Sequence, residues 1–506
     1  MRSDSSGGNA LRAGEARGRS WATAVRKEQL PANLEEHLRR CEEFFDQYSE
    51  VVEFWRRRNA GYHAAIASLM RFYVPAGARV LEIGSGTGDL LAATHPSRGL
   101  GIEIAARMVH LASAKHPHLE FRQMAAERLN LSGEQFDYII LSDLVGFLYD
   151  IRLVFEGLRA AAHPGTRIIA HWYSRLWQPV LSRAEKLGLK YPQPVLNWTT
   201  VEDITNLLYL ANFEVIRNRR HILLPKRVPV LSRLANRVLA HLPGLRHLCL
   251  SNWIVARPVG LKGETTAPSV SVICPCRNEA GNIAQVVERV PSLGAHRELI
   301  FVEGHSSDQT LEECRRAAAS HPDMDLQVLV QEGRGKGDAV RLGFSKARGD
   351  ILMILDADLS VAPEDLGQFY EALVSGKGEF INGCRLVYSM DARAMRFLNL
   401  LGNRFFALLL SYLLGQPVKD TLCGTKVLWR RDYEQIEAGR GYFGSLDPFG
   451  DFDLLLGASK LNRKIVEAPI RYRQRTYGAT NISRFSDGWL LLRMSARAAA
   501  KLFFIA

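Results

Sequence analysis

The stretch GDILMILDADLS, residues 349–360, decides the fold that we expect for the second half of this chain. Residues 351–355 are apolar, and the run is short and β-branched enough for a buried strand of a parallel sheet. Such a strand would end on Asp356 and Asp358, and ligands bind at the carboxyl ends of strands in open α/β sheets. Two carboxylates in Asp-x-Asp order supply the hard oxygen ligands of Mg²⁺ or Mn²⁺, ions that bridge carboxylates to substrate phosphates. Taken alone, the pair is equally consistent with a solvated acidic turn.

The length and composition of the chain indicate several globular domains. Its 506 residues exceed one ordinary core, and roughly 150 residues per domain predict two to four domains. With 65 Lys and Arg against 53 Asp and Glu, the chain favours acidic partners, namely nucleotide phosphates, anionic lipid headgroups or nucleic acid. The arginines are scattered and not clustered, so we expect no nucleic-acid partner.

The cysteines and the apolar segments bear on where the protein works. Seven cysteines without a Cys-x-x-Cys pair argue against a disulfide framework or a zinc ribbon, which predicts a cytoplasmic protein. Residues 1–30 lack the apolar core of a signal peptide and are expected to form a disordered leader. The best candidate span, residues 397–415, contains Asn403 and Arg404, and an arginine inside the bilayer costs about 2.5–3.5 kcal/mol. We expect this segment to be buried in protein or to lie at an interface, so that any membrane attachment is peripheral, on the cytoplasmic face.

A strand, a glycine loop and a helix are expected in the first half. Residues 30–72 have helical periodicity, residues 79–83 have the pattern of a strand, and Gly84, Gly86 and Gly88 lead into another helix. Glycines let a backbone approach a ligand closely, while the helix N-terminus presents free N–H groups to an anionic group. Dinucleotide folds use Gly-x-Gly-x-x-Gly, whereas this loop has the spacing Gly-x-Gly-x-Gly.

This spacing, preceded by Glu82, resembles motif I of the class I S-adenosylmethionine-dependent methyltransferases. A second strand ends with Glu103, nineteen residues after Gly84, where an acid accepts hydrogen bonds from ribose hydroxyls. The resemblance covers residues 60–257 and implies a Rossmann-like α/β domain at residues 31–257 that binds S-adenosylmethionine. The cofactor-binding residues that it implies are Glu82, Gly84, Gly86, Gly88, Glu103 and Asp143.

The motifs do not identify a methyl acceptor. Where the family often has an acid for the adenine amine, this chain has Ala125 and Ala126, with Glu127 as a substitute. Asp143 and His171 are candidates on the acceptor side, although a single histidine after a strand is more often a packed residue than a base. Two alternatives stay open: the first domain transfers methyl groups, or it is a non-catalytic S-adenosylmethionine-binding or docking module.

A linker is expected at residues 258–268, where Pro, Gly and Thr replace apolar residues, with a second domain at residues 269–506. Its first strand is followed by Pro275, Asn278 and Glu279, in the order Pro-x-x-Asn-Glu. This order resembles the start of the family 2 glycosyltransferases, which have the GT-A fold. The resemblance implies a second α/β domain that binds a nucleotide sugar.

Later segments carry the resemblance in the same order. The next strand ends at Glu303, and Ser307 or Asp308 can cap the helix that follows. Family members commonly have two consecutive acids where this chain has Glu303 and Gly304, which leaves the nucleobase open. Lys336 and Asp338 lie in a segment that resembles the family's Gly-x-Gly-x-Ala. The resemblance implies a nucleotide-sugar site of Pro275, Asn278, Glu279, Glu303, Asp308, Lys336, Asp338 and Asp356.

This ordered set of motifs favours Asp356 and Asp358 as ligands of Mg²⁺ or Mn²⁺, with Asp358 also catalytic, over a solvated turn. Residues 418–433 resemble a segment of polyprenol-phosphate sugar transferases, dolichol-phosphate mannosyltransferase among them. That match implies that Asp420 is the general base and that Lys426 lies on the acceptor side. A capping role for Asp420 in a helix or loop is the alternative.

Two arginines complete the expected acceptor site. Arg385 follows a predicted strand, and Arg475 begins an Arg-x-x-Gly-x-Thr segment like one of the same family. Arginine's planar fork suits phosphate oxygens, and neither residue has a carboxylate next to it in the sequence, although each is also consistent with a surface charge. The sequence thus predicts a bifunctional enzyme, in which metal-dependent sugar transfer to a polyprenyl phosphate or a related acceptor accompanies methyl transfer.

Overall fold

The computed structural model describes most of the chain, and the leader predicted at residues 1–30 lies outside the described part. The described residues are 33–131, 133–194, 196–261, 267–388, 397–443, 450–473, 477 and 484–503, with the backbone alone at 397–400 and 484–487. The chain divides into two compact units between residues 262 and 263, within the range predicted as a linker.

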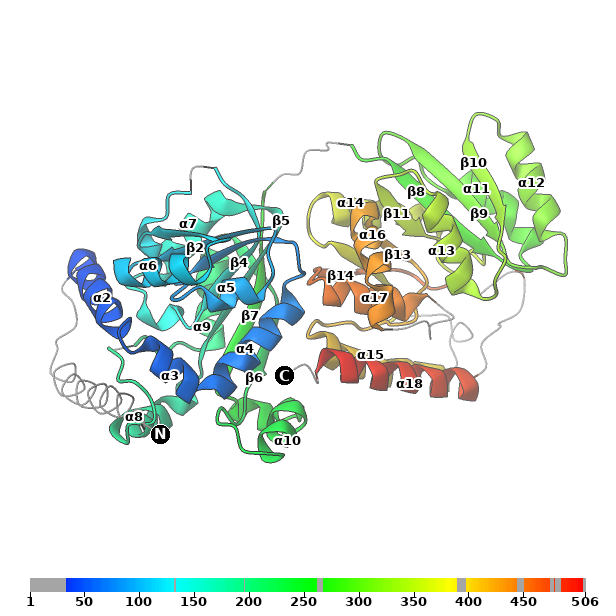
Figure 1. The fold of residues 1–506 in the computed structure, drawn as a ribbon. Helices are drawn as coiled ribbons and strands as arrows, with labels where there is room; N and C mark the ends of the chain where they lie inside the picture. Colours follow the sequence, from blue (N-terminus) through cyan, green and yellow to red (C-terminus); the bar gives the residue numbers. More distant parts are fainter. Residues whose placement is uncertain are drawn as a thin grey trace, which may run out of the picture. The chain divides into compact units, whose positions relative to one another are not determined.

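The first unit is built on a seven-stranded sheet with helices on both faces (Figure 1). Its strand order is β3-β2-β1-β4-β5-β7-β6, and the first five strands of that order are parallel, whereas β7 runs antiparallel to β5 and β6. The strands are β1 (Arg79–Ile83), β2 (Arg98–Glu103), β3 (Glu120–Gln123), β4 (Phe136–Ser142), β5 (Ala162–Tyr173), β6 (Phe213–His221) and β7 (Ser251–Pro258).

The periodic segment at 30–72 forms three helices because polar residues interrupt it. Ser49 Oγ donates to Asp46 O, and Asn59 Nδ2 donates to Trp55 O, so both side chains occupy carbonyls at helix ends. The α-helices of this unit are α2 (Leu34–Tyr48), α3 (Val52–Arg58), α4 (Ala60–Tyr73), α5 (Asp89–Ala93), α6 (Ala106–Lys115), α7 (Ile151–Leu158), α8 (Gln178–Lys186), α9 (Val201–Leu210) and α10 (Leu231–Arg237).

The core of the first unit lies between the parallel strands and the helices that follow them. Leu81 and Ile83 of β1 are fully buried in one cluster with Val154 and Leu158 of α7 and Ile204 of α9. Parallel strands are covered on both faces, which explains why consecutive residues are buried in β1 and β4 instead of every second one. Packing therefore fixes the carboxyl ends of β1, β2 and β4, where polar residues begin.

The second unit also has a seven-stranded sheet, in the order β10-β9-β8-β11-β13-β12-β14. Only β13 runs antiparallel to its neighbours, β11 and β12. The run predicted as a strand at 351–355 forms β11, which is one residue shorter. The strands are β8 (Val270–Cys276), β9 (Arg297–Glu303), β10 (Asp325–Val330), β11 (Ile351–Ile354), β12 (Phe380–Cys384), β13 (Lys426–Trp429) and β14 (Ile465–Pro469).

Helices cover this second sheet, and two long ones pack against each other. Figure 1 shows α15 and α18 side by side below the sheet. The α-helices are α11 (Ile283–Arg289), α12 (Thr310–Ser320), α13 (Lys336–Lys346), α14 (Leu366–Val374), α15 (Phe397–Leu414), α16 (Arg430–Ala438), α17 (Asp451–Lys460) and α18 (Arg484–Leu502). Among the described residues, none of the helices has the length and hydropathy needed to span a membrane. The prediction of two α/β domains in series is confirmed, and all seven cysteines are unpaired and buried.

Candidate functional sites

A cavity of about 550 Å³ lies at the carboxyl ends of β1, β2 and β4 in the first unit. Its volume is within the range of roughly 300–1,000 Å³ that is usual for small-molecule sites. The loop between β1 and α5 forms one side, and residues of α2, α3 and α4 form another. The cavity therefore coincides with the expected cofactor site.

The glycine loop presents bare backbone to this cavity. Gly84, Gly86 and Gly88 all have positive φ, between 52° and 74°, in the left-handed region that glycine tolerates best. A Cβ atom built at Gly86 would meet nothing within 4 Å, so open space adjoins the loop there. The loop can therefore accommodate a ligand that approaches the backbone closely.

Glu103, at the end of β2, holds the loop in place. Its Oε2 accepts a hydrogen bond from Gly86 N at 2.9 Å, and its Oε1 accepts one from Ile104 N at 2.9 Å. The side chain lines the cavity and is 6% exposed. A carboxylate oxygen has more than one lone pair, so these backbone contacts leave acceptor capacity for ribose hydroxyls.

Glu82 is a buried acid that lacks a full set of partners. Its Oε2 has no hydrogen-bond partner among the described residues, and burial raises the pKa of the carboxyl to about 8. A cationic ligand group beside it would stabilise the ionised form. S-adenosylmethionine carries an α-ammonium group, so this orphaned oxygen and the open loop both fit that cofactor.

Asp143 follows β4 and also lines the cavity. Its backbone is left-handed, with φ of 52°, and its Oδ2 accepts a hydrogen bond from Tyr62 OH at 2.7 Å. His171 lies 3.4 Å away, measured from Nδ1 to Asp143 Oδ1. The expectation that His171 follows a strand is wrong, because it lies inside β5, fully buried and stacked on Trp253. Glu127, the proposed substitute for an adenine-binding acid, lines the cavity as well.

In the second unit, Asp356 and Asp358 follow β11 as expected. Asp356 Oδ1 lies 2.5 Å from Lys336 Nζ, and Asp358 Oδ1 accepts hydrogen bonds from Ser360 N and Oγ at 3.0 and 2.6 Å. Although burial alone would lower it, the carboxylates of Asp356 and Asp451 raise the pKa of the Lys336 ammonium. Lys336 is therefore a fixed positive charge at the acidic pair.

The acidic pair fits a metal that also binds substrate phosphates. Among the described residues, no group of three His, Cys, Asp or Glu is arranged to hold an ion. Mg²⁺ commonly takes one or two carboxylates and completes its shell with water and substrate phosphates, so two carboxylates are sufficient for that mode.

Gly424 brings a second segment against the acidic pair. A Cβ atom at this position would lie 2.0 Å from Asp356 Oδ2 and 2.2 Å from Lys336 Nζ. Only a glycine lets the loop between Asp420 and β13 approach so closely. The 418–433 segment and the Asp-x-Asp segment, which are distant in the sequence, therefore form one site.

Loops after β8 and β9 bind each other through residues that were predicted for the nucleotide sugar. Asn278 Oδ1 accepts a hydrogen bond from Ser307 N at 2.8 Å, and Glu279 N donates to Thr310 Oγ1 at 2.9 Å. Pro275 is half-buried within β8. These contacts fix the shape of the loops and leave the direct nucleotide contacts as predictions.

The remaining residues of this group also hold backbone. Glu303 Oε1 accepts from Ser306 N, Asp338 Oδ2 from Gly333 N, and Asp308 Oδ1 from Thr310 N at 3.0 Å. The predicted capping position of Asp308 is wrong by one residue, because α12 begins at Thr310 with Gln309 as its N-cap.

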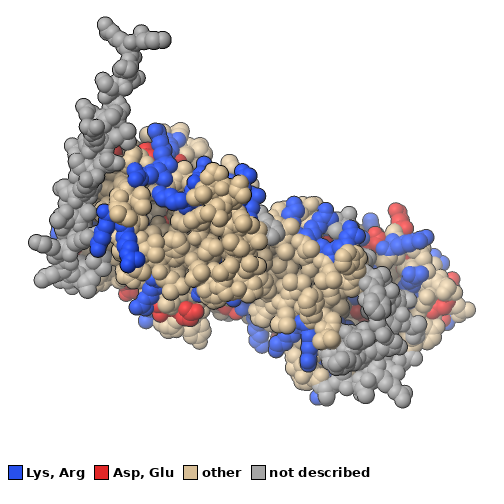
Figure 2. All heavy atoms as spheres, turned by 90° about the horizontal axis from the view of Figure 1, so that it is seen from below, with Lys and Arg blue, Asp and Glu red and all other residues tan. Residues whose placement is uncertain are grey.

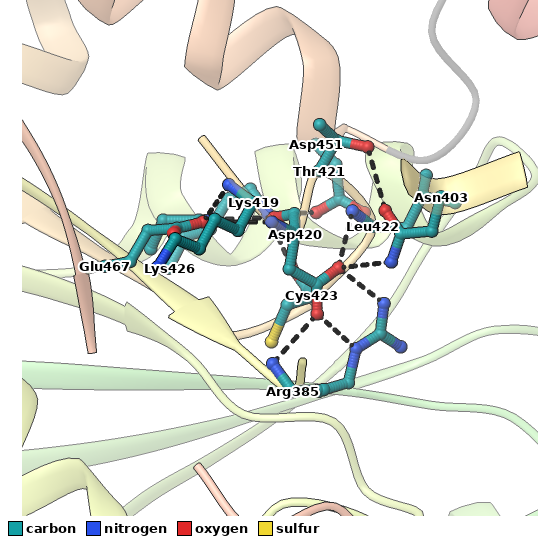
Figure 3. Close-up of polar contacts among 11 residues, drawn as sticks. Arg385, Asn403, Lys419, Asp420, Thr421, Leu422, Cys423, Lys426, Asp451 and Glu467 are labelled. Carbon is teal, nitrogen blue, oxygen red and sulfur yellow. Dashed lines mark hydrogen bonds and ion pairs between the residues drawn. The ribbon is translucent and has the colours of Figure 1, made fainter. Parts of the chain in front are cut away.

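Asp420 and Arg385 form a buried ion pair, which corrects the expectation for Asp420 (Figure 3). Arg385 Nε donates to Asp420 Oδ2 at 2.7 Å and Nη2 donates to Oδ1 at 2.8 Å, so the carboxylate partner of Arg385 comes from a segment distant in the sequence. Although burial alone would raise it, Arg385 lowers the pKa of Asp420 to about 2. A fully buried carboxylate with this pKa is a poor proton acceptor at neutral pH, so the general-base role does not fit.

Lys426 is also wrongly predicted as an acceptor ligand. Its side chain is completely buried, and its Nζ lies 3.0 Å from Asp451 Oδ1 at the start of α17. Lys426 thus joins β13 to α17 inside the unit. Arg475, the third predicted acceptor ligand, lies outside the described residues.

Sequence reasoning missed two residues around Asp420. Asn403 Nδ2, from α15, donates to Asp420 Oδ1 at 2.9 Å, and Glu467 Oε1 accepts hydrogen bonds from Lys419 N and Asp420 N (Figure 3). The available signal was an asparagine within an otherwise apolar helix, which we had considered only as an argument against a membrane span.

Family models match both halves of the chain. A model described as "Methyltransferase domain" matches residues 54–218, and one described as "Glycosyl transferase family 2" matches residues 271–436. Each match lies within one compact unit. The order of the two matches is the order in which the two resemblances occur in the sequence.

Curated relatives align with part of the chain. The low-salt glycan biosynthesis hexosyltransferase Agl6 of Haloferax volcanii is 29% identical over 244 residues, 47% of this chain and 55% of that protein. The dolichol-phosphate mannosyltransferase of Pyrococcus furiosus is 27% identical over 220 residues, 42% of this chain and 59% of that protein. An undecaprenyl-phosphate 4-deoxy-4-formamido-L-arabinose transferase of Edwardsiella ictaluri is 32% identical over 115 residues, 22% of this chain and 35% of that protein. The chain thus spans about half the length of the first of these relatives.

Solved structures overlap with each unit. An S-adenosylmethionine-dependent methyltransferase of Thermotoga maritima is 15% identical, with a TM-score of 0.34, over 43% of this chain and 99% of that one. The glucosyl-3-phosphoglycerate synthase of Mycobacterium tuberculosis, in complex with Mn²⁺, uridine diphosphate and glucosyl-3-phosphoglycerate, is 19% identical, with a TM-score of 0.34, over 46% of this chain and 80% of that one. Neither overlap is strong enough to carry a functional argument.

Proposed function

Since the chain joins a methyltransferase domain to a family 2 glycosyltransferase domain, we propose that it is a bifunctional transferase. The second domain transfers a sugar from a nucleotide sugar to a polyprenyl phosphate or a related lipid phosphate. The first domain transfers a methyl group from S-adenosylmethionine. The observation that carries the proposal for sugar transfer is the convergence of Asp356, Lys336 and Gly424, because it joins the expected donor site to the segment shared with polyprenol-phosphate transferases.

On the donor side, Asp356 and Asp358 hold Mg²⁺ or Mn²⁺ together with the donor diphosphate. The metal supplies positive charge that stabilises the diphosphate as it leaves the sugar. Lys336 adds a second positive charge 2.5 Å from Asp356, which suits a phosphate oxygen. Gly424 keeps the acceptor segment within reach of this group.

On the acceptor side, Arg385 binds the lipid phosphate and Asp420 positions it. Asp420 takes the Nε and Nη2 edge of the guanidinium, while Nη1 makes no hydrogen bond to any described residue. Arginine's remaining donors suit phosphate oxygens. A phosphate acceptor is already ionised, so sugar transfer to it does not need a general base, which agrees with the low pKa of Asp420.

A lipid acceptor requires access to a membrane surface, and α15 and α18 offer apolar side chains for it. The exposed apolar residues are Leu401, Phe405 and Leu408 on α15, and Trp489 and Leu492 on α18. Arg493 and Arg497 are exposed on α18 beside them. Figure 2, viewed from the side on which these helices lie in Figure 1, shows a largely uncharged surface with Lys and Arg along its edges. Such a surface suits peripheral attachment to anionic lipid.

Ligand binding by the purified chain tests both halves of the proposal. Melting temperature is measured with UDP-, GDP- and CDP-linked sugars in Mn²⁺ or in EDTA, and S-adenosylmethionine binding is measured by calorimetry. A ligand at a hundredfold its Kd stabilises the folded state by about 2.7 kcal/mol, which shifts a melting temperature visibly. We expect one class of nucleotide sugar to stabilise the protein in Mn²⁺ only, and S-adenosylmethionine to bind. Equal stabilisation in EDTA contradicts the metal role, and absence of S-adenosylmethionine binding contradicts the methyl-transfer role.

A further inference from the structure

We propose that the cavity of the first unit holds, next to S-adenosylmethionine, a methyl acceptor that is a ring compound with an uncharged hydroxyl group, and that Asp143 takes the hydroxyl proton. This inference rests on the proposed methyl-transfer function and adds the chemical class of the acceptor. For Asp143, which the sequence left open between a cofactor contact and the acceptor side, it assigns the acceptor side.

The cavity is lined by aromatic side chains as well as by the glycine loop. The aromatic part of the lining, which we call the aromatic compartment, consists of Tyr48, Trp55, Tyr62, Tyr173 and Tyr191. No residue of the cofactor motif belongs to it. The aromatic compartment is therefore available to a second ligand.

The aromatic rings are arranged as walls rather than as isolated side chains. The ring of Tyr191 lies 4.8 Å from that of Tyr48 and 5.9 Å from that of Trp55, measured between centroids. Tyr62 and Tyr173 form a second packed pair, with centroids 6.0 Å apart. Rings at this spacing pack directly against one another and form a rigid apolar lining, against which a flat or ring-shaped ligand can lie.

Asp143 is the carboxylate that adjoins both the aromatic compartment and the glycine loop. Its Oδ1 is buried beside His171, 3.4 Å from Nδ1, whereas its Oδ2 accepts a hydrogen bond from Tyr62 OH. The side chain lines the cavity and is 25% exposed, so Oδ2 is the oxygen that a ligand can reach. The left-handed backbone at a non-glycine residue is costly, and such geometry concentrates at functional sites. An acceptor hydroxyl can therefore donate to Oδ2, because a carboxylate oxygen accepts more than one hydrogen bond.

His171 supports Asp143 from behind as a positioning residue. Its Nδ1 lies 3.4 Å from Asp143 Oδ1, its Nε2 is 2.7 Å from Ser142 Oγ, and its ring stacks on Trp253 at 4.4 Å. His171 is fully buried and does not line the cavity. It can hold the carboxylate in place without touching the acceptor.

The charges around Asp143 favour an uncharged acceptor over an ammonium or a carboxylate. Lys190 Nζ lies 5.8 Å from the centroid of the Tyr173 ring and forms an ion pair with Glu185 at 2.7 Å. Burial lowers the pKa of the Lys190 ammonium, and the carboxylates of Glu185 and Asp143 oppose that shift, which places Lys190 within the field of Asp143. A protonated amine in the aromatic compartment would meet the charge of Lys190, and a carboxylate would meet Asp143.

Methyl transfer to a hydroxyl balances with these residues alone. The acceptor oxygen forms a bond to the methyl carbon while the carbon–sulfur bond breaks, and its electron pair stays on sulfur, which becomes neutral. The hydroxyl proton passes to Asp143 Oδ2 and from there to water. No oxidant, reductant or further reactant is required.

The first test uses the full chain saturated with S-adenosylhomocysteine, whose binding is measured by calorimetry. Phenol, benzyl alcohol and methyl glucoside are then compared with benzylamine and benzoate by melting temperature. We expect at least one hydroxyl compound to raise the melting temperature further and, in a separate assay with methyl-labelled S-adenosylmethionine in place of S-adenosylhomocysteine, to accept the labelled methyl group, and both charged compounds to do neither. Stabilisation by benzylamine or benzoate alone, or by none of the five, overturns the inference. Failure of S-adenosylhomocysteine itself to bind contradicts the proposed methyl-transfer function instead.

The second test separates an acceptor role of Asp143 from a cofactor role. Asp143→Asn should lower methyl transfer by about 100-fold or more, the usual contribution of a positioned base, and leave the Kd for S-adenosylhomocysteine within threefold. Asp137→Asn, near the start of β4 and outside the cavity lining, is the matched control. It should change neither the rate of methyl transfer nor the Kd for S-adenosylhomocysteine. Tyr191→Leu should remove the stabilisation by the hydroxyl compound without changing cofactor binding. An equal loss of cofactor binding and transfer in Asp143→Asn makes it a cofactor ligand and refutes the inference.

Discussion

At the scale of single residues, Asp420 and Arg385 show how a motif residue acts through a neighbour. They are 35 positions apart in the chain, and nothing in the spacing indicates that they meet. Three side-chain donors from Arg385 and Asn403 converge on the Asp420 carboxylate. Their combined field explains why this acid stays ionised inside the unit, and why it suits orientation of a cation better than proton transfer.

We expect Asp420→Asn to destabilise the second unit by about 3–5 kcal/mol, because it leaves Arg385 buried without its counter-charge. Urea denaturation followed by tryptophan fluorescence measures the change. The pKa of Asp420 is about 2 instead of 3.8, so its stabilisation is present above pH 4 and is lost as pH falls toward 2. Asp350→Asn, at the residue immediately before β11, serves as the control. Wild-type stability in Asp420→Asn would show that the pair contributes nothing.

The raised pKa of Glu82 predicts that binding of S-adenosylmethionine releases protons. With a pKa of about 8 the carboxyl is mostly protonated at pH 7, and the α-ammonium of S-adenosylmethionine stabilises its ionised form. Binding should therefore release protons, which calorimetry at pH 7 detects as a dependence of enthalpy on the buffer. In Glu82→Gln the dependence should vanish. The same shift means that, without ligand, Glu82 makes folding less favourable as pH rises from 4.5 through 8. Binding without proton release in the wild type would refute this account.

At the scale of elements, apolar runs and glycines in the sequence predicted strands and loops. Contacts between segments that are distant in the sequence could not be predicted from it. The run at 79–83 gave β1 with the predicted bounds, because Val80, Leu81 and Ile83 make it a mostly apolar run of the kind that forms a buried parallel strand. The periodicity at 30–72 could not locate the breaks between α2, α3 and α4, because single Ser and Asn side chains determine them. The burial of Lys426 escaped prediction because its partner, Asp451, belongs to a helix that begins 25 residues later.

The aromatic compartment was also beyond prediction. Its residues come from α2, α3, α4, the end of β5 and the loop after α8, and none belongs to a motif. Tyrosine and tryptophan in helices indicate a core as readily as a ligand site. Only the fold shows that these side chains surround a cavity.

Gly424→Ala tests whether the loop between Asp420 and β13 forms one site with Asp356 and Lys336. The added Cβ would overlap Asp356 Oδ2 and Lys336 Nζ, so the loop has to withdraw. We expect the Kd for the preferred nucleotide sugar to rise at least tenfold in calorimetry with Mn²⁺. Gly367→Ala on α14, where a Cβ meets nothing within 4 Å, is the matched control. An unchanged Kd for the nucleotide sugar in Gly424→Ala would show that this loop does not form one site with Asp356 and Lys336.

At the scale of the whole molecule, a net charge of +12 and the exposed apolar side chains of α15 and α18 suit an anionic membrane surface. We expect the protein to float with vesicles that contain phosphatidylglycerol, to bind neutral vesicles weakly, and to be released by about 1 M salt, where the Debye length is roughly 3 Å. Arg493→Glu with Arg497→Glu should weaken flotation several-fold.

The control for flotation is a charge-matched pair elsewhere, Arg315→Glu with Arg316→Glu, on exposed positions of α12. Equal losses in the two double variants would mean that net charge alone drives attachment. Retention on vesicles until detergent is added would contradict peripheral attachment.

The activity that we propose for the second domain is the transfer of a sugar to a lipid phosphate. The most direct measurement is incubation of the purified chain with its preferred labelled nucleotide sugar, Mn²⁺ and either polyprenyl phosphate or a soluble saccharide, followed by extraction into organic solvent. The account predicts label in the organic phase with polyprenyl phosphate, its loss in EDTA and in Asp358→Ala, and no product with the saccharide. Ready glycosylation of the soluble saccharide with no lipid product would contradict it.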